Sequence, residues 1–130
     1  MKKFEAEAFV RPNDIDDTSS PTTTYINYSI KETKRIIPYV NNDKETTVFK
    51  FDQLRMSKQE YAIYQTVKDW TAEQKQARIN ELQSYLSDTD WYAARLAETG
   101  VKIPKDIKHA RADARIEISL LRDLEEITNE

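Results

Sequence analysis

The sequence predicts an α+β fold, with a small N-terminal antiparallel β region over residues 1–55 and a C-terminal helical hairpin or bundle over residues 56–130. Two observations support this prediction. The first region is rich in β-branched residues, aromatic residues and turn formers, and several of its runs alternate between two sides. In the second region, apolar residues recur at three- and four-residue steps, which is typical of amphipathic helices.

The first strand candidate is "KFEAEAFV", in which Phe4, Ala6, Ala8 and Val10 fall on one side. The segment that follows, "RPNDIDDTSSPTTT" over residues 11–24, is polar and contains two prolines. Prolines and small polar residues favour turns over regular pairing, so we expect a loop there.

Three further runs complete the predicted β region. "TYINYSI" and "KRIIPYV" are strand candidates, and Pro38 in the second has no amide donor, so that strand should lie at an edge or bend. "VNNDKETT" is expected to be a hairpin turn, although it lacks an Asn-Gly pair. "TTVFKFDQL" then provides the last strand.

Two capping boxes predict where helices begin. Ser57 and Glu60 have the spacing in which each side chain accepts the other residue's free amide, at the start of "SKQEYAIYQTVKDW". Thr71 and Gln74 repeat the spacing, so we expect the helix to break or bend at Trp70.

The stretch "SDTDWYAARLAETGVKIPKDI" is predicted to be a corner between helices. Asp88 or Thr89 would cap a short helix that Trp91 anchors by burying its ring, so that Trp91→Ala would cost roughly 3–5 kcal/mol. Gly100 suits the left-handed position that ends a helix. Pro104 suits the first turn of the last helix.

The last helix carries a broad apolar stripe. We expect this stripe to be wider than one neighbouring helix can cover, so that part of it is left exposed. Exposed apolar patches commonly mark interaction sites. The predicted partner-binding residues are Ile116, Leu120, Leu121, Leu124 and Ile127. Glutamate at Leu120 or Leu124 would then abolish association while leaving most helicity intact.

The composition excludes several classes of active site. With no cysteine and one glycine there is no thiolate site and no phosphate-binding glycine loop. The single histidine, His109, is expected to face solvent. The carboxylates of "NDIDD" and the pair Asp88 and Asp90 are better explained by a solvated loop and by helix capping. We therefore predict no enzyme, no cofactor and no metal.

The charge balance argues against a nucleic-acid partner. Net charge is −3 and the signs are almost balanced over 33% charged residues. A small basic cluster of Lys31, Lys34 and Arg35 beside two tyrosines leaves nucleic-acid binding as a weaker alternative to a charged sheet face. No run is long and apolar enough for a membrane span, so no membrane partner is expected.

A resemblance adds a function. "RINELQSYLSDTDWYAARLAETGVKIPKDIKHARADARIEISLL" resembles the C-terminal segment of tailed-phage tail assembly chaperones and tail-fibre assembly proteins. The matching pieces are Arg78, Leu82, Leu86, "SDTDW" with Trp91, "KIP", and residues 111–120. The chain departs from that family by inserting "YAARLAETG" and by having "KHARADAR" in place of a tryptophan-tyrosine-arginine run.

This resemblance implies a non-enzymatic bacteriophage morphogenesis protein that acts in tail or tail-fibre assembly. The alternative is a permanent structural component of the virion, in the tail, baseplate or adaptor. The implied partners are a phage tail or baseplate protein and copies of the chain itself. The implied location is the host cytoplasm during assembly, or the virion. The family has no catalytic residues to transfer.

Overall fold

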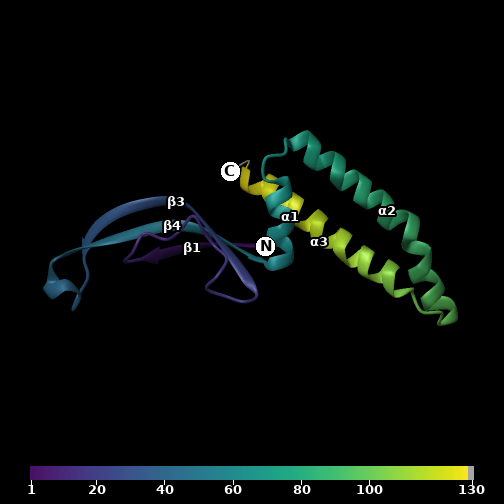
Figure 1. The fold of residues 1–130 in the computed structure, drawn as a ribbon, viewed down its shortest axis with the longest axis horizontal. Helices are drawn as coiled ribbons and strands as arrows, with labels where there is room; N and C mark the ends of the chain where they lie inside the picture. The colour runs from purple at the N-terminus through teal and green to yellow at the C-terminus, as the bar shows by residue number, and fades with distance from the viewer. Residues whose placement is uncertain (129–130) are drawn as a thin grey trace. The chain divides into compact units, whose positions relative to one another are not determined.

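A computed structural model describes residues 1–128. The chain divides into two compact units, Met1–Tyr61 and Ala62–Glu130. The first contains an antiparallel sheet and the second contains helices, which confirms the predicted α+β class (Figure 1). The unit boundary lies a few residues beyond the expected one, inside helix α1 (Lys58–Val67), because the last strand continues through Ser57 to the first turn of that helix.

The sheet has four antiparallel strands in the order β1-β4-β3-β2. Their bounds are β1 Lys2–Ala8, β2 Ile15–Asp16, β3 Thr23–Ile36 and β4 Glu45–Ser57. The predicted loop over residues 11–24 therefore includes a two-residue strand. β3 and β4 form the expected hairpin, and their connection contains a short 3-10 turn at Asn41–Asp43.

The two strand candidates "TYINYSI" and "KRIIPYV" are joined in the single strand β3. A register shift between Tyr28 and Lys31 accommodates an irregularity at Ser29, whose φ is 51°. A bulge of this kind absorbs an extra residue, so pairing with β4 continues on both sides. β3 ends at Ile36, so Pro38 lies outside the ladder, where its missing amide donor costs no sheet hydrogen bond.

The apolar core of the sheet unit lies mainly on one face. Leu54 and Met56 are buried on β4 and pair with Ile26 and Thr24 of β3, which are also buried. Directly paired residues point to the same face of a sheet, and so does Val48, which is an even number of residues away on β4. Side-chain alternation therefore selects these residues for the interior.

Both predicted capping boxes are present. The Ser57 amide donates to Oε1 of Glu60 at 3.0 Å, and the Glu60 amide donates to Oγ of Ser57 at 3.1 Å. The Thr71 amide donates to Oε1 of Gln74 at 2.8 Å, and the Gln74 amide donates back to Oγ1 of Thr71 at 3.2 Å. The predicted break at Trp70 is confirmed, because α1 ends at Val67 and the next helix begins at Ala72.

The predicted short helix that Asp88 or Thr89 would cap is wrong. Helix α2 runs without interruption over Ala72–Thr99, so both residues lie in its interior. Oγ1 of Thr89 donates to the carbonyl of Tyr85 at 2.8 Å, one turn earlier, instead of accepting from a free amide. A threonine that bonds back in this way can remain inside a helix.

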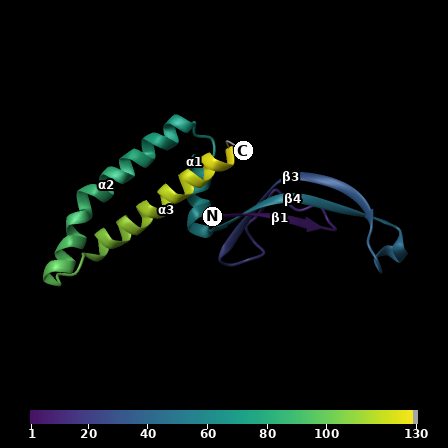
Figure 2. The same ribbon diagram turned by 180° about the vertical axis from the view of Figure 1, so that it is seen from behind.

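Helix α3 (Lys105–Thr128) follows α2 and lies antiparallel beside it (Figures 1 and 2). Gly100 occupies the expected left-handed position between them, with φ 74°, and its amide donates to the carbonyl of Leu96 at 3.0 Å. Pro104 comes immediately before α3, and its carbonyl accepts from the amide of Lys108 at 2.9 Å. Pro104 thus precedes the first turn of α3, whereas the sequence predicted it inside that turn.

Gly100→Ala should destabilise the chain by about 1 kcal/mol. A Cβ at Gly100 would have no heavy atom within 4 Å, so the cost comes from the positive φ alone and not from a clash. Denaturant unfolding would measure the change, and Gly100→Asn should cost less because asparagine tolerates this conformation better. A wild-type stability for Gly100→Ala would contradict the left-handed cap.

Candidate functional site

A buried arginine joins α2 to α3 and positions the surface described below. Arg111 of α3 is 5% exposed. Its guanidinium donates to the carbonyl of Leu86 at 2.8 Å, to Oγ1 of Thr89, and to Oδ1 of Asp90 at 2.7 Å. Thr89 and Asp90 of "SDTD" thus bind the neighbouring helix.

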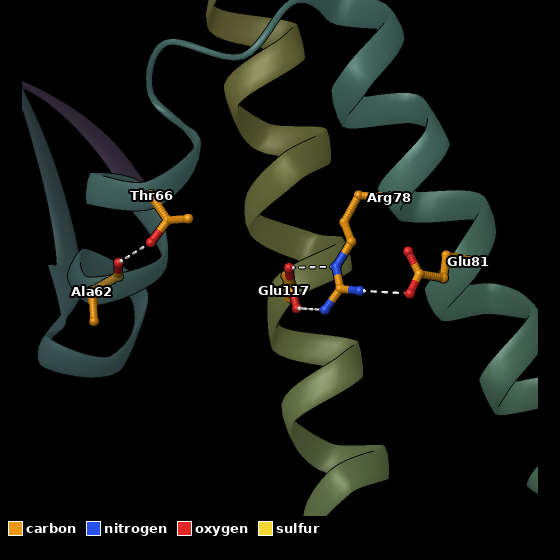
Figure 3. Close-up of polar contacts among 5 residues, drawn as sticks. All are labelled: Ala62, Thr66, Arg78, Glu81 and Glu117. Carbon is orange, nitrogen blue, oxygen red and sulfur yellow. Dashed lines mark hydrogen bonds and ion pairs between the residues drawn. The ribbon is translucent and has the colours of Figure 1, made fainter.

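Two more ion pairs cross between the same helices. Arg78 of α2 donates to both carboxylate oxygens of Glu117 at 2.9 and 3.2 Å, and it also pairs with Glu81 on its own helix (Figure 3). The hydrogen bonds from Arg78 to Glu117 raise the pKa of the arginine further, so it stays charged. Nζ of the buried Lys75 lies 3.5 Å from Glu125. Charged contacts therefore join the helices along much of their length.

Arg111→Ala should cost about 2–3 kcal/mol, since it removes charge-assisted hydrogen bonds made in a desolvated position. Asp90→Ala should cost under about 1 kcal/mol, because that carboxylate is 67% exposed and its pair is partly solvated. Arg111→Lys should recover only part of the loss, since an ammonium cannot reproduce the planar fork. Equal losses for Arg111→Ala and Asp90→Ala in urea unfolding would contradict this assignment.

The predicted partner stripe on α3 is not an exposed surface. Leu120 and Leu121 are 0% exposed and Leu124 is 7% exposed, while Ile116 and Ile127 are half-buried. The stripe is broad because it belongs to the interior of the folded chain. Glutamate at Leu120 or Leu124 would place a charge there, so it should unfold the helices, whereas the sequence-based expectation was that helicity would remain.

The prediction that Trp91 is a buried anchor is also wrong. Trp91 is 51% exposed, and the helix in which it lies continues through it to Thr99. The ring stacks on Tyr92 with centroids 3.8 Å apart and planes 25° apart. The guanidinium carbon of Arg95 lies 5.2 Å from the Trp91 centroid and 5.6 Å from that of Tyr92. The result is a half-exposed cluster of two rings and one cation.

Arg95 has an unsatisfied donor within the part of the chain that the structure describes. Its Nε is buried without a hydrogen-bond partner, although the guanidinium lies against two rings. Contact with aromatic faces favours a cation but supplies no acceptor for its N–H groups. The half-buried guanidinium of Arg95 therefore supplies the positive charge of this cluster.

Two more large apolar side chains are exposed near the end of α2. Leu96 is one turn after Tyr92, and Val101 follows the cap; they are 41% and 45% exposed. We refer to Trp91, Tyr92, Arg95, Leu96 and Val101 as the tip surface. Sequence reasoning selected Trp91 as important but assigned it to the interior. The spacing of Trp91, Tyr92 and Arg95, which brings the arginine within one helical turn of both rings, was the signal that could have revealed the cluster.

The other sequence candidates do not assemble into a reactive site. His109 is exposed, as predicted. Among residues 1–128, no group of three or more histidine, aspartate or glutamate side chains is placed to hold a metal ion. In the basic cluster, Arg35 pairs with Glu7 on β1. No helix in this range is long and apolar enough to cross a bilayer.

The sheet unit has an open groove of about 510 Å³ beside the bulge. It is lined by Glu5, Ala6, Glu7, Ser29, Lys31, Lys50, Phe51 and Asp52. Lys50 and Glu7 on its wall lie 3.8 Å apart and neutralise one another in part. Mixed charge and an open shape do not single out a class of ligand.

Comparisons with protein-family models, with curated proteins and with solved structures found no match to this chain.

Trp91→Ala should cost under about 1 kcal/mol, because the ring is half-exposed and leaves little cavity. Leu121→Ala, at a fully buried position, should cost about 2–5 kcal/mol. Thermal unfolding followed by circular dichroism compares the two variants directly. A larger loss for Trp91→Ala than for Leu121→Ala would restore the buried anchor and remove the tip surface.

Proposed function

We propose that this chain is a non-enzymatic bacteriophage morphogenesis protein that acts in tail or tail-fibre assembly through protein–protein contacts. Its partners are a phage tail or baseplate protein and further copies of the chain itself. The protein acts in the host cytoplasm during assembly and needs no cofactor. Its chemistry is recognition, with no covalent step.

The resemblance to tail assembly proteins supports the phage setting. The resembling segment, residues 78–121, corresponds to most of α2 and the first two-thirds of α3, including the turn at Gly100. The matching residues Arg78 and Trp91 have different roles in this hairpin: Arg78 pairs with Glu117 across the helices, and Trp91 is presented outward. The segment is therefore a folded unit that carries one exposed aromatic group.

The observation that carries the proposal is the exposed Trp91, which stacks on Tyr92 beside the half-buried cation of Arg95. Tryptophan, tyrosine and arginine are the residue types that most often dominate binding energy at protein interfaces. Rigid helices hold this cluster, so little side-chain or backbone freedom is lost on binding. The exposure of Trp91 gives a partner access to its ring.

The alternative is a permanent component of the virion, in the tail, baseplate or adaptor. The same surface would then hold a neighbour in the finished particle. Mass spectrometry of purified particles distinguishes the two proposals. An assembly factor is present in infected cells and absent from or minor in particles, whereas a structural component is present at fixed stoichiometry.

The test of the main proposal is complementation of a phage that carries an amber codon in this gene. Without suppression, infected cells should accumulate particles with missing or incomplete tails or fibres, visible by negative-stain electron microscopy. Wild-type protein from a plasmid should restore infectious titre. The double variant Trp91→Ala and Arg95→Ala should restore about tenfold less titre or worse, since each residue has the character of an interface hot spot.

Two controls separate binding from folding. Arg122→Ala removes an exposed arginine on α3 outside the tip surface and should complement fully. Circular dichroism should give the same melting temperature for the double variant as for the wild type to within a few degrees. Normal particles from the unsuppressed amber mutant, or full complementation by the double variant, would reject the proposal.

A further inference from the structure

A second exposed surface, in the sheet unit, carries charge of the opposite sign to that of the tip surface. Residues 9–17 form a segment that we call the acidic loop. Phe9, Val10 and Ile15 are 59%, 77% and 44% exposed in it. Asp14, Asp16 and Asp17 are interspersed with them.

The acidic loop is held in a defined conformation. The buried Asn27 of β3 donates its amide to the carbonyl of Asp14 at 2.8 Å and its Nδ2 to the carbonyl of Asn13 at 2.8 Å. The hydroxyl and amide of Ser19 donate to the carboxylate of Asp16 and lower its pKa, so that group is ionised at neutral pH. The loop therefore presents its charges from a fixed frame.

The charges of the two surfaces are complementary. The helix end and turn that contain the tip surface, residues 91–108, hold Arg95, Lys102, Lys105 and Lys108 against Glu98 and Asp106. Just before them lie the exposed Asp88 and Asp90, and Asp90 pairs with Arg111. The acidic loop contains three aspartates against Arg11, and Lys58 donates to the carbonyl of Asp17 at 2.6 Å. Both surfaces also have exposed apolar side chains. They differ in the sign of their charge.

We propose that the acidic loop of one copy docks on the tip surface of a second copy. This inference rests on the proposed function, because it takes the tip surface to be a protein-binding site and names its occupant. The guanidinium of Arg95 receives a loop carboxylate, most simply that of Asp14 or Asp17, whose side chains are exposed. The ring of Trp91 covers the apolar side chain of Ile15.

Contact between two different patches has a consequence for the assembly. Each copy carries one loop patch and one tip patch, so the contact is heterologous and an open oligomer still offers one free patch at each of its two ends. Such contacts generate a ring if the rotation closes and a filament if it does not. Association should weaken as salt rises, because the ion pairs lie at an exposed surface.

The test uses two variants of the full chain. The tip variant carries Trp91→Ala and Arg95→Ala. The loop variant carries Asp14→Asn, Ile15→Thr and Asp17→Asn, which keep similar shapes and leave Asp16 and its turn intact. In sedimentation velocity, wild type should form oligomers larger than a dimer as concentration rises. Each variant alone should associate about tenfold more weakly or not at all.

Mixing the variants gives the decisive result. The tip variant retains an intact loop and the loop variant retains an intact tip, so an equimolar mixture should form a one-to-one heterodimer that cannot extend. Arg122→Ala should associate like wild type, and circular dichroism should show that all variants are folded. A monomeric wild type, a mixture that stays monomeric, or oligomers unaffected by the loop variant would overturn the inference.

Failure here is distinguishable from failure of the proposed function. If wild type is monomeric but the tip variant does not complement the amber phage, the tip surface binds another protein, for example an acidic segment of a tail protein. If the two variants behave as described in sedimentation but the tip variant complements fully, self-association is real and the assembly role is wrong.

Discussion

The arrangement of the helical unit depends on the burial of one cation, Arg111. A guanidinium removed from water must find acceptors, because an unpaired buried charge costs several kcal/mol. Arg111 finds them in a helix carbonyl, a threonine hydroxyl and a carboxylate, all on a single turn of α2. Sliding α3 along α2 would withdraw all three acceptors, so this set of contacts specifies the register of the two helices.

The register agrees with the position of the turn. Arg111 and Asp90, and also Lys75 and Glu125, lie at nearly equal distances along the chain from Gly100. An antiparallel hairpin that turns at Gly100 brings such residues opposite one another. Glycine supplies the left-handed conformation of the turn, and the charged pairs supply the alignment of the two helices. Neither feature alone would place Trp91 where it is.

The same alignment explains why the exposed surface lies at the tip. Along α3, most of the long apolar side chains are buried in the interior, so the broad stripe offers no binding face. Towards the turn, α2 has fewer residues to bury, and its aromatic and basic side chains remain accessible. A rigid hairpin that ends in two rings and a cation is suited to recognition, and the acidic loop of the sheet unit has the complementary character. The proposed head-to-tail contact would use both units of the chain.

The sequence by itself determined the features that depend on local physics. The α+β class, the strand alternation, both capping boxes, the break at Trp70 and the glycine cap each follow from residues within a few positions of one another. Tertiary structure decided the rest. It joined two strand candidates through the bulge at Ser29, buried Leu120 and Leu121, and kept α2 continuous through "SDTD". Those outcomes depend on partners far along the chain. A threonine favours a helix cap in isolation, and only Arg111 on another helix supplied the donor that Thr89 and Asp90 bind inside α2.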